Sequence, residues 1–120
     1  MAHILVCDDD EHIRELIKEV LSIDGHTFDT AANGAEALER LRTGTYALLI
    51  IDRNMPKMNG VHAVQLIRSN PNTKDLKVLM CTSASVTAEV DEAFAAGATD
   101  YILKPINLQA LAAKVKKHLA

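Results

Sequence analysis

A chain of 120 residues with 48% hydrophobic and 24% charged residues is long enough for one domain with its own core, and we expect residues 1–120 to form that single domain. The formal net charge of −3 and the 3% aromatic content argue against direct nucleic-acid binding, because phosphate contacts need clustered Lys and Arg and base stacking needs aromatic rings. No apolar run approaches a membrane span, and the N-terminus lacks a signal-peptide pattern, so we expect a cytoplasmic protein without membrane contact.

The first half of the chain alternates short apolar runs with helical patterns. Residues 3–7 predict a strand, and the helix that follows ends at Gly25. Its apolar stripe is Ile13, Leu16, Ile17, Val20 and Leu21. Residues 26–31 alternate polar and apolar side chains, which predicts a half-exposed edge strand. The next helix is expected to be capped by Asn33 and to end by Gly44.

The second half continues the alternation. Strands are predicted over 46–51, 77–81 and 100–103. The helical stripes between and after them are Val61, Val64 and Ile67; Val86, Val90, Ala93 and Phe94; and Leu108, Leu111, Val115 and Leu119. Five strands alternating with five helices predict right-handed βαβ units, and therefore a parallel sheet with helices on both faces.

Polar side chains follow four of the five predicted strands. They are Asp8, Asp9 and Asp10 after the first strand, Asp52 after the third, Thr82 and Ser83 after the fourth, and Lys104 and Pro105 after the fifth. The carboxyl ends of parallel strands share one edge of the sheet, which is where open α/β folds bind ligands. We therefore expect these groups to form one site.

The residue types at this edge indicate phosphoryl chemistry. Three carboxylates within a few ångströms repel one another, and a divalent cation relieves that repulsion. An open site with only oxygen ligands suits Mg²⁺, or Mn²⁺ in its place. Lys104 and the Thr82 hydroxyl could then bind phosphate oxygens. Asp52 could act as the nucleophile, because carboxylates form aspartyl-phosphate intermediates.

Each of these polar groups also has an ordinary structural alternative. The alternatives are helix capping for Asp8, Asp9 and Asp10, turn formation for Asp52, capping of a helix near Ser85 for Thr82 and Ser83, and simple solvation for Lys104. We expect Asp10 to be a helix cap. The basic residues Lys114, Lys116, Lys117 and His118 are expected to form a solvated face at the end of the last helix.

Four segments of the chain carry a family resemblance. ILVCDDD, LLIIDRNMPKMNG, VLMCTSAS and GATDYILKPIN occur in this order, each at a predicted strand end. Together they resemble the response-regulator receiver domain of two-component signalling, and the resemblance spans essentially the whole chain. It implies a flavodoxin-like (βα)5 three-layer sandwich with a parallel sheet of order 2-1-3-4-5. It also implies a signalling switch and not an enzyme that turns over a substrate.

The resemblance assigns roles to the strand-end residues. It implies that Asp52 is the phosphoacceptor and that Lys104 contacts the phosphoryl group. It implies that Mg²⁺ is held by Asp9, Asp52 and the backbone carbonyl of Asn54, with Asp8 acting through water.

Further residues are assigned to the switch. The resemblance implies that Thr82 also contacts the phosphoryl group and that the Tyr101 ring turns inward when Thr82 shifts. The bond between Lys104 and Pro105 is a candidate for a cis peptide. The residues expected to tune the lifetime of the phosphoryl group are Arg53, Asn54 and Ala84.

Partners follow from the same resemblance. A sensor histidine kinase or a phosphotransfer protein is expected to dock on the first helix, on the stripe of Ile13, Leu16 and Ile17. An output protein or domain is expected to bind the face made by the fourth helix, fifth strand and fifth helix. We expect a monomer or a weak phosphorylation-dependent dimer.

Two rival functions use the same groups. Haloacid-dehalogenase-like phosphohydrolases also have a strand-end Asp nucleophile with Thr or Ser, Lys and Mg²⁺. They need a second Asp two residues after the nucleophile, where this chain has Asn54. The other rival is a degenerate receiver that only binds proteins, which the intact acids, Thr82 and Lys104 disfavour.

The two cysteines are predicted to be free thiols. Cys7 and Cys81 both lie in apolar runs, which is typical of small buried residues in a reducing compartment. In the order 2-1-3-4-5 they are separated by roughly two strand spacings, 9 to 10 Å, which is too far for a disulfide.

Overall fold

The structure is a computed structural model that describes residues 2–83 and 87–119. Its strands are β1 (His3–Cys7), β2 (Thr27–Ala31), β3 (Leu48–Asp52), β4 (Lys77–Thr82) and β5 (Asp100–Leu103). Its helices are α1 (Glu11–Ile23), α2 (Gly34–Thr43), α3 (Gly60–Ser69), α4 (Thr87–Ala96) and α5 (Leu108–Leu119). Within the described ranges, none of the helices combines the length and the apolar character needed to cross a lipid bilayer.

All the strands pair in parallel, in the order β2-β1-β3-β4-β5, which confirms the predicted sheet. The register fixes which side chains meet at the carboxyl edge. Cys7 pairs with Ile51, so the residues that follow them, Asp8 and Asp52, emerge side by side. Thr82 pairs with Leu103, which places Lys104 directly after the pair.

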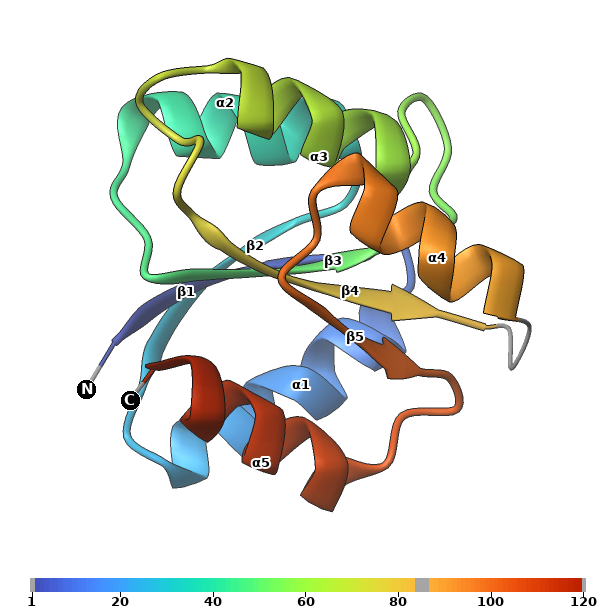
Figure 1. The fold of residues 1–120 in the computed structure, drawn as a ribbon. Helices are drawn as coiled ribbons and strands as arrows, with labels where there is room; N and C mark the ends of the chain where they lie inside the picture. Colours follow the sequence, from blue (N-terminus) through green and yellow to red (C-terminus); the bar gives the residue numbers. More distant parts are fainter. Residues whose placement is uncertain (1, 84–86, 120) are drawn as a thin grey trace.

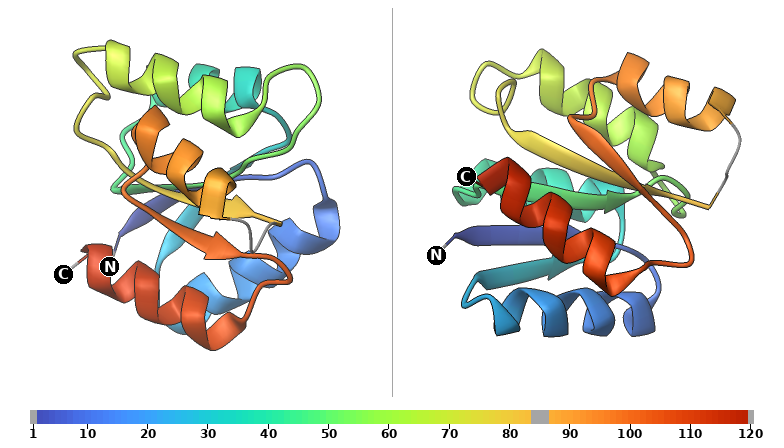
Figure 2. Two further views of the ribbon diagram at one scale, coloured as in Figure 1. Left: turned by 45° about the vertical axis from the view of Figure 1, so that its right-hand side comes forward. Right: turned by 60° about the horizontal axis from the view of Figure 1, so that its bottom comes forward.

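Helices cover both faces of the sheet (Figure 1), and this gives the molecule two cores. Alternate strand residues point to opposite faces, so Leu49 and Ile51 pack under α2, α3 and α4, whereas Leu48 and Ile50 pack against α1 and α5. Because both faces are covered, β3 is an unbroken apolar run up to its last residue. The start of β1 and the end of α5 lie together at the amino edge of the sheet (Figure 2).

Both cysteines are free and buried, as predicted. Cys7 belongs to the core under α2, α3 and α4, and Cys81 belongs to the core on the other face of the sheet. Burial raises the pKa of both thiols, that of Cys81 to about 12. Neither thiol is therefore a reactive thiolate at neutral pH.

The helix starts are fixed by short polar caps next to the strand ends. The Asp10 carboxylate accepts hydrogen bonds from the backbone N–H groups of His12 and Ile13, which confirms Asp10 as the cap of α1. Asn33 caps α2 by accepting from the N–H of Glu36. These caps place helix N-termini just beyond the carboxyl edge of the sheet.

Several element boundaries differ from the predicted ones by one or two residues. The second strand begins at Thr27 and not at His26, and the fourth strand ends at Thr82 and not at Cys81. The third strand begins at Leu48, two residues later than expected, and the side chain of the preceding Tyr46 contacts β1 and β2. Its hydroxyl donates to Asp29 at 2.7 Å, and its ring stacks on His3 with the centroids 4.9 Å apart. The predicted helical residue Val86 lies outside the described residues, and α4 begins at Thr87.

The prediction of a solvated basic face on α5 is wrong for two of its four residues. Lys114 Nζ lies 3.1 Å and His118 Nε2 lies 2.8 Å from the Asp100 carboxylate, and both side chains are half-buried. Lys116 and Lys117 are exposed, as expected. The difference arises because α5 turns one side toward the start of β5.

Candidate functional site

Three carboxylates meet at the carboxyl edge of the sheet. Asp8, Asp9 and Asp52 each present an oxygen within 4.8 Å of the others. Asp8 and Asp52 are almost fully buried, with 1% and 4% exposed surface, whereas Asp9 is exposed. Together with Lys104 we call this group the acid site. Burial of two neighbouring carboxylates is unfavourable unless they are paired, so the arrangement indicates a function.

Lys104 reaches the buried acids from the end of β5. Its Nζ lies 3.1 Å from Asp52 Oδ2 and 3.2 Å from Asp8 Oδ2. Its backbone N–H donates to the Thr82 carbonyl at 2.7 Å, which continues the β4–β5 pairing to the edge of the sheet. The Lys104–Pro105 peptide bond is cis. The sequence-predicted cation therefore sits between the two buried carboxylates.

The charges of the acid site do not balance. Burial raises the pKa of Asp52 above its ordinary value, the neighbouring Asp8 carboxylate raises it further, and the charge and hydrogen bond of Lys104 offset only part of the rise. Burial alone would lower the pKa of Lys104, but the Asp52 and Asp8 charges outweigh it and raise that pKa. The ammonium thus stays charged, and the acids still carry an excess of negative charge.

The donor set fits a hard divalent cation. The three clustered ligand atoms are carboxylate oxygens. Asp8 Oδ1 already accepts from the N–H of Asp10 at 2.9 Å, and Asp52 Oδ1 accepts a longer bond, 3.4 Å, from the N–H of Asn54. Within residues 2–83 and 87–119, the Asp9 carboxylate has no hydrogen-bond or ion-pair partner. A divalent ion would satisfy these oxygens and reduce the charge excess.

Gly60 sets the position of the loop that follows Asp52. A Cβ atom at Gly60 would lie 2.3 Å from the Asp52 carbonyl oxygen, which is far inside van der Waals contact. The Gly60 N–H donates to the Arg53 carbonyl at 2.9 Å. Only glycine lets α3 begin this close to the end of β3, and the close approach fixes the backbone on both sides of the Asp52 side chain.

Thr82 is fully buried at the end of β4, and its hydroxyl donates to Glu89 Oε2 at 3.0 Å. Glu89 also lies 3.5 Å from the guanidinium of Arg53. Glu89 is not among the residues that the sequence predicts for the site. The available signal was the spacing of Glu89 and Glu92, which places two acids on one side of a helix that follows Thr82.

Tyr101 lies outside the acid site. Its ring meets Phe94 edge to face, with the centroids 5.9 Å apart, and Lys114 Nζ lies 4.2 Å from its centroid. The residue is half-buried between α4 and α5. The structure therefore brings together Asp8, Asp9, Asp52 and Lys104, and it leaves Tyr101 apart from them, on β5 between α4 and α5. Ala84 lies outside the described residues.

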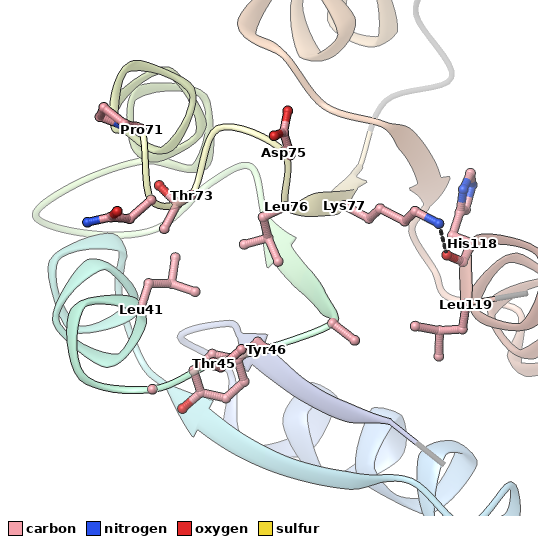
Figure 3. Close-up of a pocket in the computed structure, with 13 residues that line it drawn as sticks. Leu41, Thr45, Tyr46, Pro71, Thr73, Asp75, Leu76, Lys77, His118 and Leu119 are labelled. Atoms are coloured by element: carbon pink, nitrogen blue, oxygen red, sulfur yellow. Dashed lines mark hydrogen bonds between the residues drawn. The ribbon is translucent and has the colours of Figure 1, made fainter.

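A hollow lies at the opposite, amino edge of the sheet. It has a volume of about 440 Å³ and is bordered by Leu41, Tyr46, Leu76 and Leu119 among others (Figure 3). Its lysine, Lys77, already donates to the His118 carbonyl at 2.6 Å. Asp75 is the one carboxylate among the described residues that line the hollow, so the lining lacks the clustered acids of the acid site.

Comparisons with known proteins agree with this geometry. The family model for the response regulator receiver domain matches residues 4–116. The chain is 36% identical over 115 residues to the chemotaxis protein CheY of Pseudomonas aeruginosa, covering 95% of this chain and 93% of that protein. It is 35% identical over 113 residues to the response regulator MprA of Mycobacterium ulcerans, covering 94% of this chain. The chain spans only 48% of MprA, about half of its length.

A solved structure shares both the fold and much of the sequence. It is the response regulator protein TrrA from Thermotoga maritima in complex with Mg²⁺-BeF, with a TM-score of 0.87 and 40% identity. The match covers 99% of this chain and 100% of that chain. With its flavodoxin-like fold and its acidic pocket of Asp8, Asp9 and Asp52, the chain belongs to the response regulator receiver domains, the phosphoacceptor switches of two-component signalling, and not to a class of conventional enzymes.

Proposed function

We propose that this chain, over residues 1–120, is a single receiver domain that accepts a phosphoryl group on Asp52 from the phosphohistidine of a sensor kinase or of a phosphotransfer protein. The observation that carries the proposal is the acid site, in which Asp52 is buried beside Asp8 and both contact Lys104. A strand-end carboxylate next to a cation is the arrangement that a phosphoryl acceptor needs.

The transfer step assigns a role to each group. A carboxylate oxygen of Asp52 attacks phosphorus, the phosphorus–nitrogen bond of the donor breaks, and its electron pair remains on the imidazole nitrogen, which takes up a proton. Lys104, now bound to Asp52 and Asp8, is placed to bind an oxygen of the incoming group. The Thr82 hydroxyl, at the end of the neighbouring strand, supplies a hydrogen bond to another.

Magnesium fits this site, with Mn²⁺ as a substitute. Asp9, Asp52 and the backbone carbonyl of Asn54 would hold the ion, and Asp8 would act through a water molecule. The exposed Asp9 carboxylate and the excess negative charge support this assignment. When bound, the ion neutralises charge on the acids and on the phosphoryl oxygens. The relative TrrA, which is solved with Mg²⁺-BeF, supports the same choice of metal.

The proposed output surface is the face made by α4, β5 and α5. A phosphoryl group adds a charge of about −2, which would draw the Thr82 hydroxyl toward Asp52. We expect Tyr101 to respond by turning inward, away from its edge contact with Phe94. Phe94 and Leu103 are exposed on this face, at 44% and 39%, and offer apolar contacts to a partner.

The proposed kinase surface is the start of α1, next to the acid site. Ile13 and Leu16 are half-buried and remain partly accessible. Ile17 is only 1% exposed and belongs to the core against α1 and α5, so it cannot take part in docking as expected. The docking stripe is therefore shorter than the sequence predicted.

We propose that the chain is a monomer, or a weak dimer that forms on phosphorylation.

One experiment tests the proposed function. The chain is incubated with Mg²⁺ and a small phosphodonor such as phosphoramidate, and intact mass spectrometry counts the phosphoryl adducts. We expect one adduct on the wild type and none on Asp52→Asn, with Ser83→Ala as the matched control that retains the adduct, because Ser83 is exposed beside the site. An adduct that persists in Asp52→Asn would place the acceptor elsewhere.

A further inference from the structure

Two acids of α4, Glu89 and Glu92, form a charged cluster with Arg53, next to the acid site. The Arg53 guanidinium lies 3.5 Å from Glu89 and 3.0 Å from Glu92, and Arg53 directly follows Asp52 in the chain. The Arg53 side chain is only 18% exposed, so these ion pairs are partly shielded from solvent. Arg53 Nη1 also donates to the Asn54 side chain at 3.2 Å. The cluster thus ties α4 to the end of β3.

Glu89 contacts both Arg53 of this cluster and the buried Thr82. Its Oε1 faces Arg53, and its Oε2 accepts the Thr82 hydroxyl at 3.0 Å. Glu89 is half-buried, whereas Thr82 is completely buried. A charge-assisted bond between a buried hydroxyl and a partly shielded carboxylate is stronger than a neutral one. One carboxylate on α4 therefore holds groups from the ends of both β3 and β4.

The bond to Glu89 uses the group that phosphorylation needs. A hydroxyl has one proton to donate, so Thr82 cannot donate to Glu89 and to a phosphoryl oxygen at the same time. The two acceptors must compete. Whatever free energy the bond to Glu89 contributes is lost when Thr82 turns to the phosphoryl group, and this lowers the affinity of the site for that group.

We propose that Glu89 is a positioning residue that opposes phosphorylation of Asp52 by holding the Thr82 hydroxyl on α4, with Arg53 keeping the Glu89 carboxylate in place. The inference rests on the proposed function, because it concerns the same phosphoryl site. It makes α4 part of the phosphorylation equilibrium. Release of Glu89 is the event by which a charge on Asp52 loosens α4 from the ends of β3 and β4.

The test compares two isosteric substitutions on one helix. Glu89→Gln keeps the shape and the helix propensity but removes the charge that strengthens the bond to Thr82. Glu92→Gln removes an equal charge, and within the described part of the chain that charge contacts Arg53, at 3.0 Å, and not Thr82. Both variants and the wild type are titrated with beryllofluoride in the presence of Mg²⁺, by calorimetry.

Glu89→Gln is expected to bind beryllofluoride about fivefold more tightly than the wild type, the size of the lost charge assistance on one hydrogen bond. Glu92→Gln is expected to stay within about twofold of the wild type, because its ion pair is half-exposed. An equal gain in both variants would mean that any negative charge on α4 weakens anion binding, and it would overturn the proposal.

A second background separates positioning from a merely structural effect. In Thr82→Ala, which lacks the hydroxyl, Glu89→Gln should no longer change the affinity, whereas in Thr82→Ser the gain should return. A gain that persists in Thr82→Ala overturns the inference and leaves the proposed function intact. Failure of the wild type to bind beryllofluoride at all would instead overturn the proposed function, and the inference with it.

Discussion

Two groups of charged side chains at opposite edges of the sheet differ in their ratio of acids to basic partners. At the carboxyl edge, the acid site sets three carboxylates against one lysine. At the amino edge, Asp100 at the start of β5 is bound by Lys114 and His118, a group that we call the Asp100 cluster. The carboxylates are comparably buried, with 5% of the Asp52 side chain and 14% of the Asp100 side chain exposed.

The pKa values show what this difference does. Burial raises the pKa of Asp52, and the Asp8 charge raises it further. Burial also acts to raise the pKa of Asp100, but hydrogen bonds from His118, from the Tyr101 N–H and from Lys114 outweigh it, so that this pKa lies below its ordinary value. Partners, and not burial, therefore separate a structural carboxylate from a functional one.

The largest expected effect comes from removing the cation of the acid site. Lys104→Met leaves Asp8 and Asp52 buried without a counter-charge, and it should lower the free energy of unfolding by about 3 kcal/mol in EDTA at neutral pH. Urea denaturation measures this loss. Addition of Mg²⁺ should restore a large part of it. A loss of the same size in the matched variant Lys114→Met would remove the contrast, because Asp100 there retains His118.

Asp100→Asn should destabilise the protein by about 2 kcal/mol at neutral pH, the scale of hydrogen bonds to a charged group. The pKa of Asp100 is lower in the folded than in the unfolded protein, so its contribution is present above the unfolded pKa near 3.8 and is lost as the pH falls through the folded value. The difference between wild type and variant in urea denaturation should therefore shrink at low pH. A constant difference would show that packing, and not charge, is responsible.

Asp52→Asn should change the free energy of unfolding in the opposite direction and stabilise the protein. The pKa of Asp52 is higher in the folded than in the unfolded protein, so the ionised carboxylate is less favourable in the folded protein. The free energy of unfolding therefore falls as the pH rises from the unfolded pKa through the folded value. The neutral variant should be more stable than the wild type by about 1 kcal/mol at neutral pH in EDTA, and this gain should vanish below the unfolded pKa near 3.8. A less stable variant at neutral pH would contradict the charge excess.

The smallest effect is expected at Asp9. Asp9→Asn removes repulsion from an exposed position, so it should raise the free energy of unfolding without metal by about 0.5 kcal/mol. It should weaken Mg²⁺ binding at the same time. Thermal melts in EDTA and calorimetric Mg²⁺ titration measure the two effects. An unchanged or lower melting temperature in EDTA would count against crowding of the acids.

The acid site could be predicted from the sequence because it follows from strand polarity. Once the alternation of strands and helices indicates a parallel sheet, Asp8, Asp52 and Lys104 must lie at one edge, whatever the details of packing. The separation of Cys7 from Cys81 follows instead from the strand order 2-1-3-4-5, which the family resemblance implied.

Contacts made by helix side chains could not be predicted in the same way. The bonds from Thr82 to Glu89 and from Lys114 to Asp100 depend on how α4 and α5 are rotated about their own axes against the sheet. An apolar stripe only fixes that rotation to within a broad face. For the same reason, the full burial of Ile17 was not evident from its place in the stripe.

The charge excess at the acid site is tested most directly by the Mg²⁺ dependence of stability. Urea denaturation at increasing free Mg²⁺ should show the free energy of unfolding of the wild type rising by about 1.4 kcal/mol for each tenfold increase above the dissociation constant. Asp9→Asn should show a rise only at higher Mg²⁺, and Lys114→Met should follow the wild type. A free energy of unfolding that is the same in Mg²⁺ and in EDTA would contradict the account.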